Sequence, residues 1–155
     1  MKGIYALLIK VKRKVNIQIG KLGKFEFPKG WYLYIGSGKN GLEKRVKRHL
    51  RKKRNLFWHI DYLLSAPDTE IEKVWIKEGG KECSLAKRIA QTDIFKIPVP
   101  GFGSSDCRCK SHLFLICQKG KEINLLRENK LFCLLYTSDA ADEGLGVDLG
   151  GRRII

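Results

Sequence analysis

The stretch WYLYIGSGKNGLEKRVKRHL, residues 31–50, has the pattern of a strand, a glycine-rich turn and a basic helix, in that order. Its first five residues are aromatic or aliphatic and suit a pleated strand. Gly36, Gly38 and Gly41 follow, and glycine accepts the positive φ angles that a sharp reversal of the backbone needs. The stretch therefore predicts a strand that turns directly into a helix.

The predicted helix is amphipathic. Leu42, Val46 and Leu50 recur every four residues and form one apolar stripe along it. Arg45 and His49 are also four residues apart, and they lie beside this stripe at the edge of the packed face. The other basic residues of this region are expected to point into solvent and contact nucleic-acid phosphates: Lys44, Lys47, Arg48, Arg51 and Lys52.

Composition limits the class of protein. A chain of 155 residues, 43% of them apolar, can form one globular domain with a hydrophobic core. A formal net charge of +15 favours an anionic partner, nucleic acid before an acidic membrane surface.

The apolar run from Ile4 to Val11 is interrupted by Lys10, so neither a membrane span nor a signal peptide is expected. Five cysteines without a secretory signal are typical of a reducing compartment, which predicts a cytoplasmic protein.

Strand and helix patterns interleave along the chain without an internal repeat. The expected strands cover residues 3–11, 15–19, 31–35, 70–77 and 112–118. The expected helices cover residues 42–50, 56–64, 82–91 and 122–130. Residues 20–30, apart from a short element at 25–27, and residues 94–110 are expected to be irregular. We therefore predict a small α/β domain of the α+β type, with a central mixed or antiparallel sheet flanked by about three helices.

The last 23 residues, 133–155, differ in composition from the chain before them. They begin CLLYTSDAADE, end VDLGGRRII and are acidic, whereas the preceding residues are strongly basic. Both flanks resemble the translation, in one frame, of a transposase-type sequencing-library adaptor. A natural disordered tail is the alternative that this composition permits. We therefore expect a domain at residues 1–132, a native C-terminus that is missing, and a non-native tail at 133–155 that packs poorly.

Two tripeptides and one helix together carry a family resemblance. Gly3-Ile4-Tyr5 and Tyr34-Ile35-Gly36 fall on predicted strands, and Arg45 and His49 follow on the next helix. In this order they resemble the motifs of the GIY-YIG nuclease family, in which a histidine or tyrosine follows an arginine by four residues. The resemblance gives Gly3 and Gly36 a structural role in the motif.

Later segments narrow the resemblance to one branch of that family. HIDYLL, ECSLA and GFGSSDCRCKSHLF, at residues 59–64, 82–86 and 101–114, resemble a prokaryotic branch whose members are sometimes fused to endonuclease-III-type repair enzymes. The resemblance covers residues 1–118, with a longer gap between the tripeptides than in the best-studied members. The family's usual late asparagine has no clear match. The implied partners are double-stranded or branched DNA and an endonuclease-III-type repair protein, with no membrane.

The resemblance implies a metal-dependent DNA endonuclease that hydrolyses phosphodiesters during repair. Glu82 would hold one Mg²⁺ or Mn²⁺ ion, for which one carboxylate with water and substrate oxygens is a normal environment. Tyr5 would act as general base or proton relay, and Tyr34 would orient the attacking water. Arg45 would clamp the phosphate through its planar guanidinium. His49 would assist proton transfer or contact the phosphate. The alternative function is a nucleic-acid-binding module that targets a partner repair enzyme without cutting DNA itself.

A second group of residues could bind a different metal. Cys83, Cys107, Cys109 and His112 offer four nitrogen and sulfur ligands of the kind that zinc prefers. However, Cys-x-Cys is not the usual Cys-x-x-Cys spacing, and buried thiols are common in protein cores. The sequence therefore favours ordinary buried thiols over a zinc site.

Overall fold

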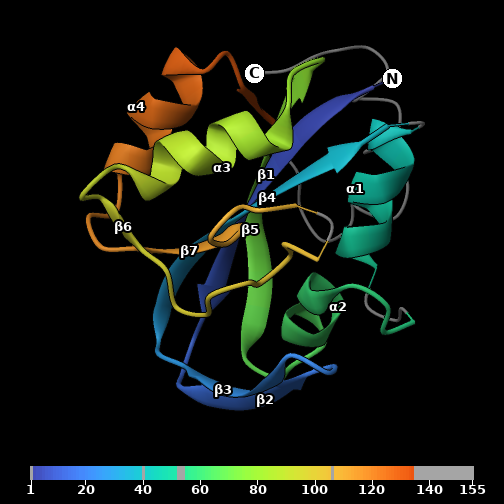
Figure 1. Cartoon of the computed structure of the whole chain (residues 1–155), viewed down its shortest axis with the longest axis vertical. Coiled ribbons are helices and arrows are strands. Elements are labelled where there is room, and N and C mark those ends of the chain that lie inside the picture. Colours follow the sequence, from blue (N-terminus) through green and yellow to red (C-terminus); the bar gives the residue numbers. More distant parts are fainter. Residues whose placement is uncertain (1, 40, 52–54, 106, 135–155) are drawn as a thin grey trace.

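Strand β1 (Gly3–Val11) lies near the middle of the sheet that organises the molecule (Figure 1). The computed structural model describes residues 2–39, 41–51, 55–105 and 107–134. Within them, six strands pair antiparallel in the order β6-β7-β4-β1-β5-β8. The other strands of this sheet are β4 (Gly30–Gly38), β5 (Thr69–Glu78), β6 (Phe95–Lys96), β7 (Leu113–Ile116) and β8 (Phe132–Leu134).

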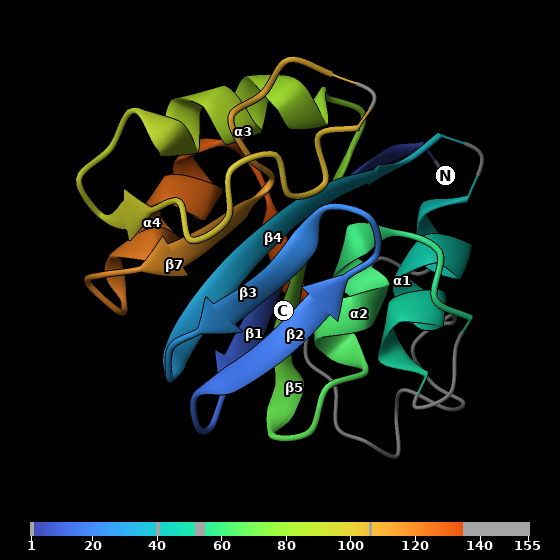
Figure 2. The same cartoon turned by 60° about the horizontal axis from the view of Figure 1, so that its bottom comes forward.

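Helices cover both faces of the sheet (Figures 1 and 2). They are α1 (Leu42–Leu50) and α2 (His59–Leu64) on one face, and α3 (Glu82–Ala90) and α4 (Lys121–Glu128) on the other. Because side chains alternate along a strand, Tyr5 and Leu7 of β1 pack beneath α1 and α2, and Ala6 and Leu8 pack beneath α3 and α4. Burial on both faces explains why the sequence of β1 is almost continuously apolar. The predicted α+β class is confirmed.

Strands β2 (Val15–Ile19) and β3 (Gly23–Phe27) form a separate two-stranded hairpin. The hairpin lies on the α2 side, and its apolar Ile19 and Phe27 are fully buried in the core there. We predicted an irregular segment over residues 20–30 with a short element at 25–27, and this prediction was wrong for Gly23 and Lys24, because the strand begins two residues earlier. The alternation of Phe25 and Phe27 is the signal of that strand, since period two marks a half-buried strand.

The buried stripe of α1 differs from the predicted one in its last residue. Leu42 and Val46 are fully buried as expected, but the third buried residue is His49, and Leu50 is only partly buried. Seven residues complete almost two helical turns, so position 49 faces the sheet more directly than position 50. The prediction that His49 lies at the edge of the packed face is therefore wrong.

Helix α2 begins at His59, three residues later than predicted. The apolar Leu56 and Phe57 suggested a helix start at residue 56, but both side chains are exposed. The buried carboxylate of Asp61, in the first turn of α2, accepts the backbone N–H of the N-cap residue Trp58 and that of Phe57 before it, as the third residue of a capping box does. Asp61 thus sets where this helix begins.

Strand β8 extends two residues past the domain boundary expected at residue 132. Cys133 and Leu134 pair with β5, and Leu134 is buried in the core. The remainder of the proposed tail, residues 135–155, lies outside the described residues. None of the helices in the described ranges is long and apolar enough to cross a membrane.

Candidate functional site

A cleft of about 800 Å³ opens where β4 ends and α1 begins, beside the first turn of α3. Four cations contribute to its lining, Lys39, Lys44, Arg45 and Arg48, and the carboxylate among the lining residues is that of Glu82. Such an excess of positive charge in a concave surface attracts anionic ligands. Lys39 was not predicted as a site residue, although its place in the glycine-rich turn was an available signal.

Tyr5 and Tyr34 lie beneath this cleft, on the sheet face that α1 covers. Their ring centroids are 6.3 Å apart. They come together because Tyr5 pairs with Gly36, so Tyr34, two residues from Gly36, points to the same face of the sheet. Tyr5 is 1% exposed and Tyr34 is 9% exposed. The two tyrosines therefore lie behind the residues that line the cleft.

The glycines of the two motif tripeptides are required by close packing. A Cβ atom at Gly36 would collide with the ring and hydroxyl of Tyr5, which is itself locked in the core. A Cβ atom at Gly3 would collide with the backbone carbonyl of Lys77 on the neighbouring strand. Gly36 thus leaves room for the ring of Tyr5, and Gly3 lets the backbones of β1 and β5 approach closely.

Burial changes the acid–base properties of both tyrosines. Burial, and then the charge of Tyr34, raise the pKa of Tyr5 well above its ordinary value, although Arg45 opposes the shift. Burial, and then the charge of Glu82, raise the pKa of Tyr34 in the same way. The Tyr5 hydroxyl lies 2.6 Å from Nε2 of His49, and it donates to that nitrogen in the tautomer with the proton on Nδ1. At neutral pH both phenols therefore stay protonated, and Tyr5 has a buried proton acceptor behind it.

His49 cannot contact a phosphate in the cleft. Its side chain is 1% exposed and lies behind Tyr5, with ring centroids 5.3 Å apart. Of the two roles predicted for His49, direct contact with the phosphate was wrong, because the imidazole occupies a core position of α1. Proton transfer through Tyr5 is the role that this geometry permits.

Arg45 lines the cleft and is held by an aromatic side chain. Its guanidinium carbon lies 4.3 Å from the ring centroid of Trp58. Burial raises the pKa of Tyr5, and the nearby charge of Arg45 opposes this effect without outweighing it. Sequence reasoning missed Trp58, which supports this cation from the residue just before α2.

Arg48 lies in the cleft wall but has a structural partner. Its guanidinium donates to both carboxylate oxygens of Asp61, at 2.6 and 2.9 Å. Burial alone would raise the pKa of Asp61, but hydrogen bonds from Arg48, Trp58 and Phe57 hold it below its ordinary value. The prediction that Arg48 projects freely from the exposed helix face was therefore wrong, because a buried carboxylate needs a paired cation. Asp61 therefore has a structural role.

The remaining predicted phosphate contacts have different positions. Lys44 is exposed and lines the cleft. Lys47 and Arg51 lie on and just after α1, outside the cleft lining. Lys52 lies outside the described residues.

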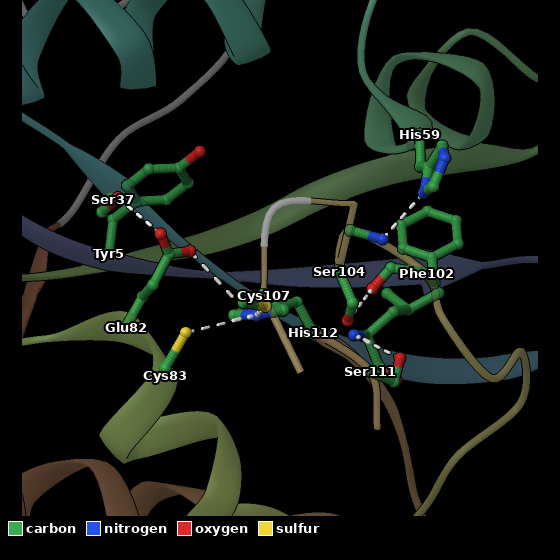
Figure 3. Close-up of polar contacts among 12 residues, drawn as sticks. Tyr5, Ser37, His59, Glu82, Cys83, Phe102, Ser104, Cys107, Ser111 and His112 are labelled. Atoms are coloured by element: carbon green, nitrogen blue, oxygen red, sulfur yellow. Dashed lines mark hydrogen bonds and ion pairs between the residues drawn. The ribbon is translucent and has the colours of Figure 1, made fainter. Parts of the chain in front are cut away.

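Glu82 enters the cleft from the first residue of α3. One of its oxygens, Oε1, accepts a 2.7 Å hydrogen bond from Ser37 of β4. The other, Oε2, lies 3.6 Å from Nδ1 of His112. Figure 3 shows this carboxylate between Ser37 and His112, on the same side as Tyr5. The structure thus brings Arg45 and Glu82 to one cleft, with Tyr5 and Tyr34 buried next to it.

Next to Glu82 lies a cluster that could hold a metal ion. Ligand atoms of Cys83, Cys107, Cys109 and His112 all lie within 4.8 Å of one another. Burial, followed by the neighbouring thiols Cys83 and Cys107, raises the pKa of Cys109 to about 12. The sequence favoured separate buried thiols, whereas the fold gathers all four side chains at the edge of the cleft. Sequence spacing did not reveal this because Cys83 lies on α3, far along the chain from the other three residues.

Comparison with known proteins gives one match. No curated protein and no solved structure matches the chain. A family model described as "Domain of unknown function DUF123" matches residues 4–131, which include both motif strands, the cleft residues and the cysteine–histidine cluster. The chain therefore belongs to the DUF123 family of domains of unknown function.

Proposed function

We propose that this domain is a metal-dependent DNA endonuclease of the GIY-YIG type, as the resemblance of its motifs implies. The observation that supports this most is the convergence of Arg45 and Glu82 in one cationic cleft above Tyr5 and Tyr34. Hydrolysis of a phosphodiester needs charge stabilisation on the phosphoryl oxygens and a route for the proton of the attacking water. The cleft and the residues behind it offer cations for the phosphoryl oxygens and hydroxyl groups for the proton.

Arg45 is the group best placed to stabilise the phosphate. A guanidinium can donate two parallel hydrogen bonds to phosphate oxygens, and it remains charged at any working pH. Stacking on Trp58 restricts its orientation before substrate binds. Lys39 and Lys44 extend the positive charge along the cleft, where the phosphates flanking the cut bond would lie.

Tyr5 acts as a proton relay in this proposal rather than as a phenolate base. Its raised pKa opposes loss of the phenolic proton at neutral pH. A relay avoids that difficulty, because the hydroxyl can pass its proton to Nε2 of His49 as it receives one from the water. Tyr34, beside it, supports the orientation of the attacking group.

Glu82 is the group that would hold a divalent ion. Mg²⁺ in phosphoryl-transfer sites is commonly held by one or two carboxylates together with substrate phosphates and water. A carboxylate accepts about four hydrogen or metal bonds, so the contacts to Ser37 and His112 leave Glu82 further capacity. The ion would supply charge neutralisation on the cleaved phosphate.

The second candidate is a DNA-binding module without catalysis. The deep burial of both tyrosines and the two existing partners of Glu82 favour it, because all three groups could serve the fold alone. In that case Arg45 and the lysines would bind phosphates, and no bond would break.

The dependence of cleavage on Glu82 and on metal tests the proposal. We expect wild-type cleavage to rise with Mg²⁺ concentration and saturate, and Glu82→Gln to lose cutting at every Mg²⁺ concentration. The matched control is Glu128→Gln, an exposed position at the end of α4, which should keep the wild-type rate. Gel electrophoresis of end-labelled DNA under single-turnover conditions measures both rates. Equal metal-dependent cutting by wild type and Glu82→Gln would remove Glu82 from the mechanism.

A further inference from the structure

We propose that Cys83, Cys107, Cys109 and His112 bind one zinc ion in a closed, four-coordinate structural site that fixes one wall of the cleft. The four residues come from three places: the first turn of α3, the irregular segment between β6 and β7, and the residue just before β7. Figure 3 shows Cys83 and His112 directed toward one another beside Cys107. Binding of zinc itself does not depend on the proposed nuclease activity.

The distances match a single tetrahedral ion. With Zn–S near 2.3 Å and Zn–N near 2.0 Å, a tetrahedron places two sulfurs about 3.8 Å apart, and a sulfur and a nitrogen about 3.5 Å apart. Nε2 of His112 lies 3.3 Å from Sγ of Cys107 and 4.0 Å from Sγ of Cys83. All four ligand atoms lie within 4.8 Å of one another. One ion at their centre therefore reaches every ligand with small side-chain adjustments.

The orientation of His112 provides separate evidence for a metal. Its Nε2 points to the thiols, while its Nδ1 faces Oε2 of Glu82 at 3.6 Å. A histidine that binds zinc through one ring nitrogen usually directs the other to a carboxylate or carbonyl, which fixes its tautomer and orientation. Glu82 is placed for this role, and Ser37 in turn holds Glu82. The arrangement is that of a ligand with its supporting carboxylate.

Ligand chemistry selects zinc over the divalent ion proposed for catalysis. Thiolate and imidazole are poor ligands for Mg²⁺ and suit zinc, which takes three cysteines and one histidine in structural sites. Four protein ligands complete the tetrahedron, so no position remains for water or substrate. The two metals would thus occupy different positions, with Glu82 between them.

Zinc would stabilise a segment that has little other regular structure. Residues 97–112 contain no helix or strand within their described part, and Gly103, Cys107 and His112 of this segment line the cleft. The backbone N–H of Gly103 donates to Nδ1 of the His59 side chain, and the backbone N–H of Ile35 donates to the carbonyl of His112, which anchors the segment to α2 and β4. A metal bridge to Cys83 would add the link to α3. If the proposed function holds, the same bridge also positions Glu82 through His112.

Metal analysis of the purified full-length chain tests the proposal. We expect one zinc per chain by inductively coupled plasma mass spectrometry. We also expect the absorption bands of tetrahedral, thiolate-bound cobalt after exchange with Co²⁺. Cys107→Ser should lose the bound zinc and lower the melting temperature. The matched control is Cys117→Ser, an exposed cysteine outside the cluster, which should keep both at wild-type values.

Three results would overturn the proposal. They are a wild-type chain that binds neither zinc nor cobalt when expressed with added zinc, a chain that holds iron instead, and equal zinc content in Cys107→Ser and wild type. The wild-type measurement decides the question even where Cys107→Ser does not fold. Because metal content is measured without DNA, a failed zinc site and a failed nuclease assay give separate answers.

Discussion

Arg45→Ala is expected to lower the rate of DNA cleavage by about 10²–10³-fold, the usual effect of removing one preorganised stabiliser of transition-state charge. DNA affinity should change much less, because Lys39 and Lys44 line the same cleft and the whole chain carries a net charge of +15. The fold should persist, since the stacking of Arg45 on Trp58 contributes only about 0.5–1 kcal/mol at a partly exposed site. Single-turnover cleavage and fluorescence anisotropy separate the effects on rate and affinity.

The control for this prediction is Arg88→Ala. Arg88 is an exposed arginine of α3 outside the cleft lining, so its loss removes the same charge from the protein without touching the site. Equal cleavage rates for the two variants would show that Arg45 contributes general charge rather than transition-state stabilisation. A parallel loss of affinity and rate in Arg45→Ala would place its role in binding alone.

Asp61→Asn is expected to destabilise the folded protein by about 3 kcal/mol, the lower end of the range for breaking a buried ion pair, because Arg48 keeps partial contact with solvent. The Asp61 carboxylate accepts hydrogen bonds from Arg48 and from the backbone of Phe57 and Trp58. An amide at this position cannot accept all of them or neutralise the guanidinium. Urea denaturation at pH 7, followed by circular dichroism, measures the change in the free energy of unfolding.

The same substitution should show a characteristic pH dependence. Because the pKa of Asp61 is lowered in the folded protein, its contribution to stability is complete above the ordinary pKa of 3.8. It is lost as the pH falls toward the lowered value. The stability difference between wild type and Asp61→Asn should therefore be full at pH 7 and should narrow below about pH 4.

The exposed Asp93→Asn serves as control and should leave stability within about 0.5 kcal/mol of wild type. A constant difference across this pH range would contradict the role given to the ion pair.

Local sequence patterns predicted the elements on which the site is built. The run of aliphatic and aromatic residues before Gly36 predicted β4, and the four-residue spacing after Gly41 predicted α1 with its observed bounds. These patterns succeed because each element meets the sheet through one periodic face. The family resemblance gave Tyr5 and Tyr34 roles in one site, and the pairing of β1 with β4 in the structure brings the two tripeptides side by side.

Contacts between distant residues were much harder to predict. His49 is buried because its imidazole has a hydrogen-bond partner in Tyr5. The apolar pattern of the helix instead predicted that Leu50 would be the buried residue at this end. The late start of α2 depends on the Asp61 carboxylate and its partner Arg48, thirteen residues earlier in the chain. The cysteine–histidine cluster depends on the packing of α3 beside the segment before β7. In each case a contact between polar side chains that are distant in sequence decides the local structure. Residue spacing along the chain does not reveal such a contact.

Cleavage of DNA by the wild-type chain tests most directly whether the cleft is an active site. The full-length protein is incubated with linear, nicked and branched duplexes in Mg²⁺ or Mn²⁺, with EDTA as the metal-free control, and strand scission is followed on denaturing gels. The proposed nuclease predicts scission of at least one of these DNAs in the presence of metal and none with EDTA. Tight binding to all three DNAs without scission under either metal would contradict it and identify the domain as a binding module.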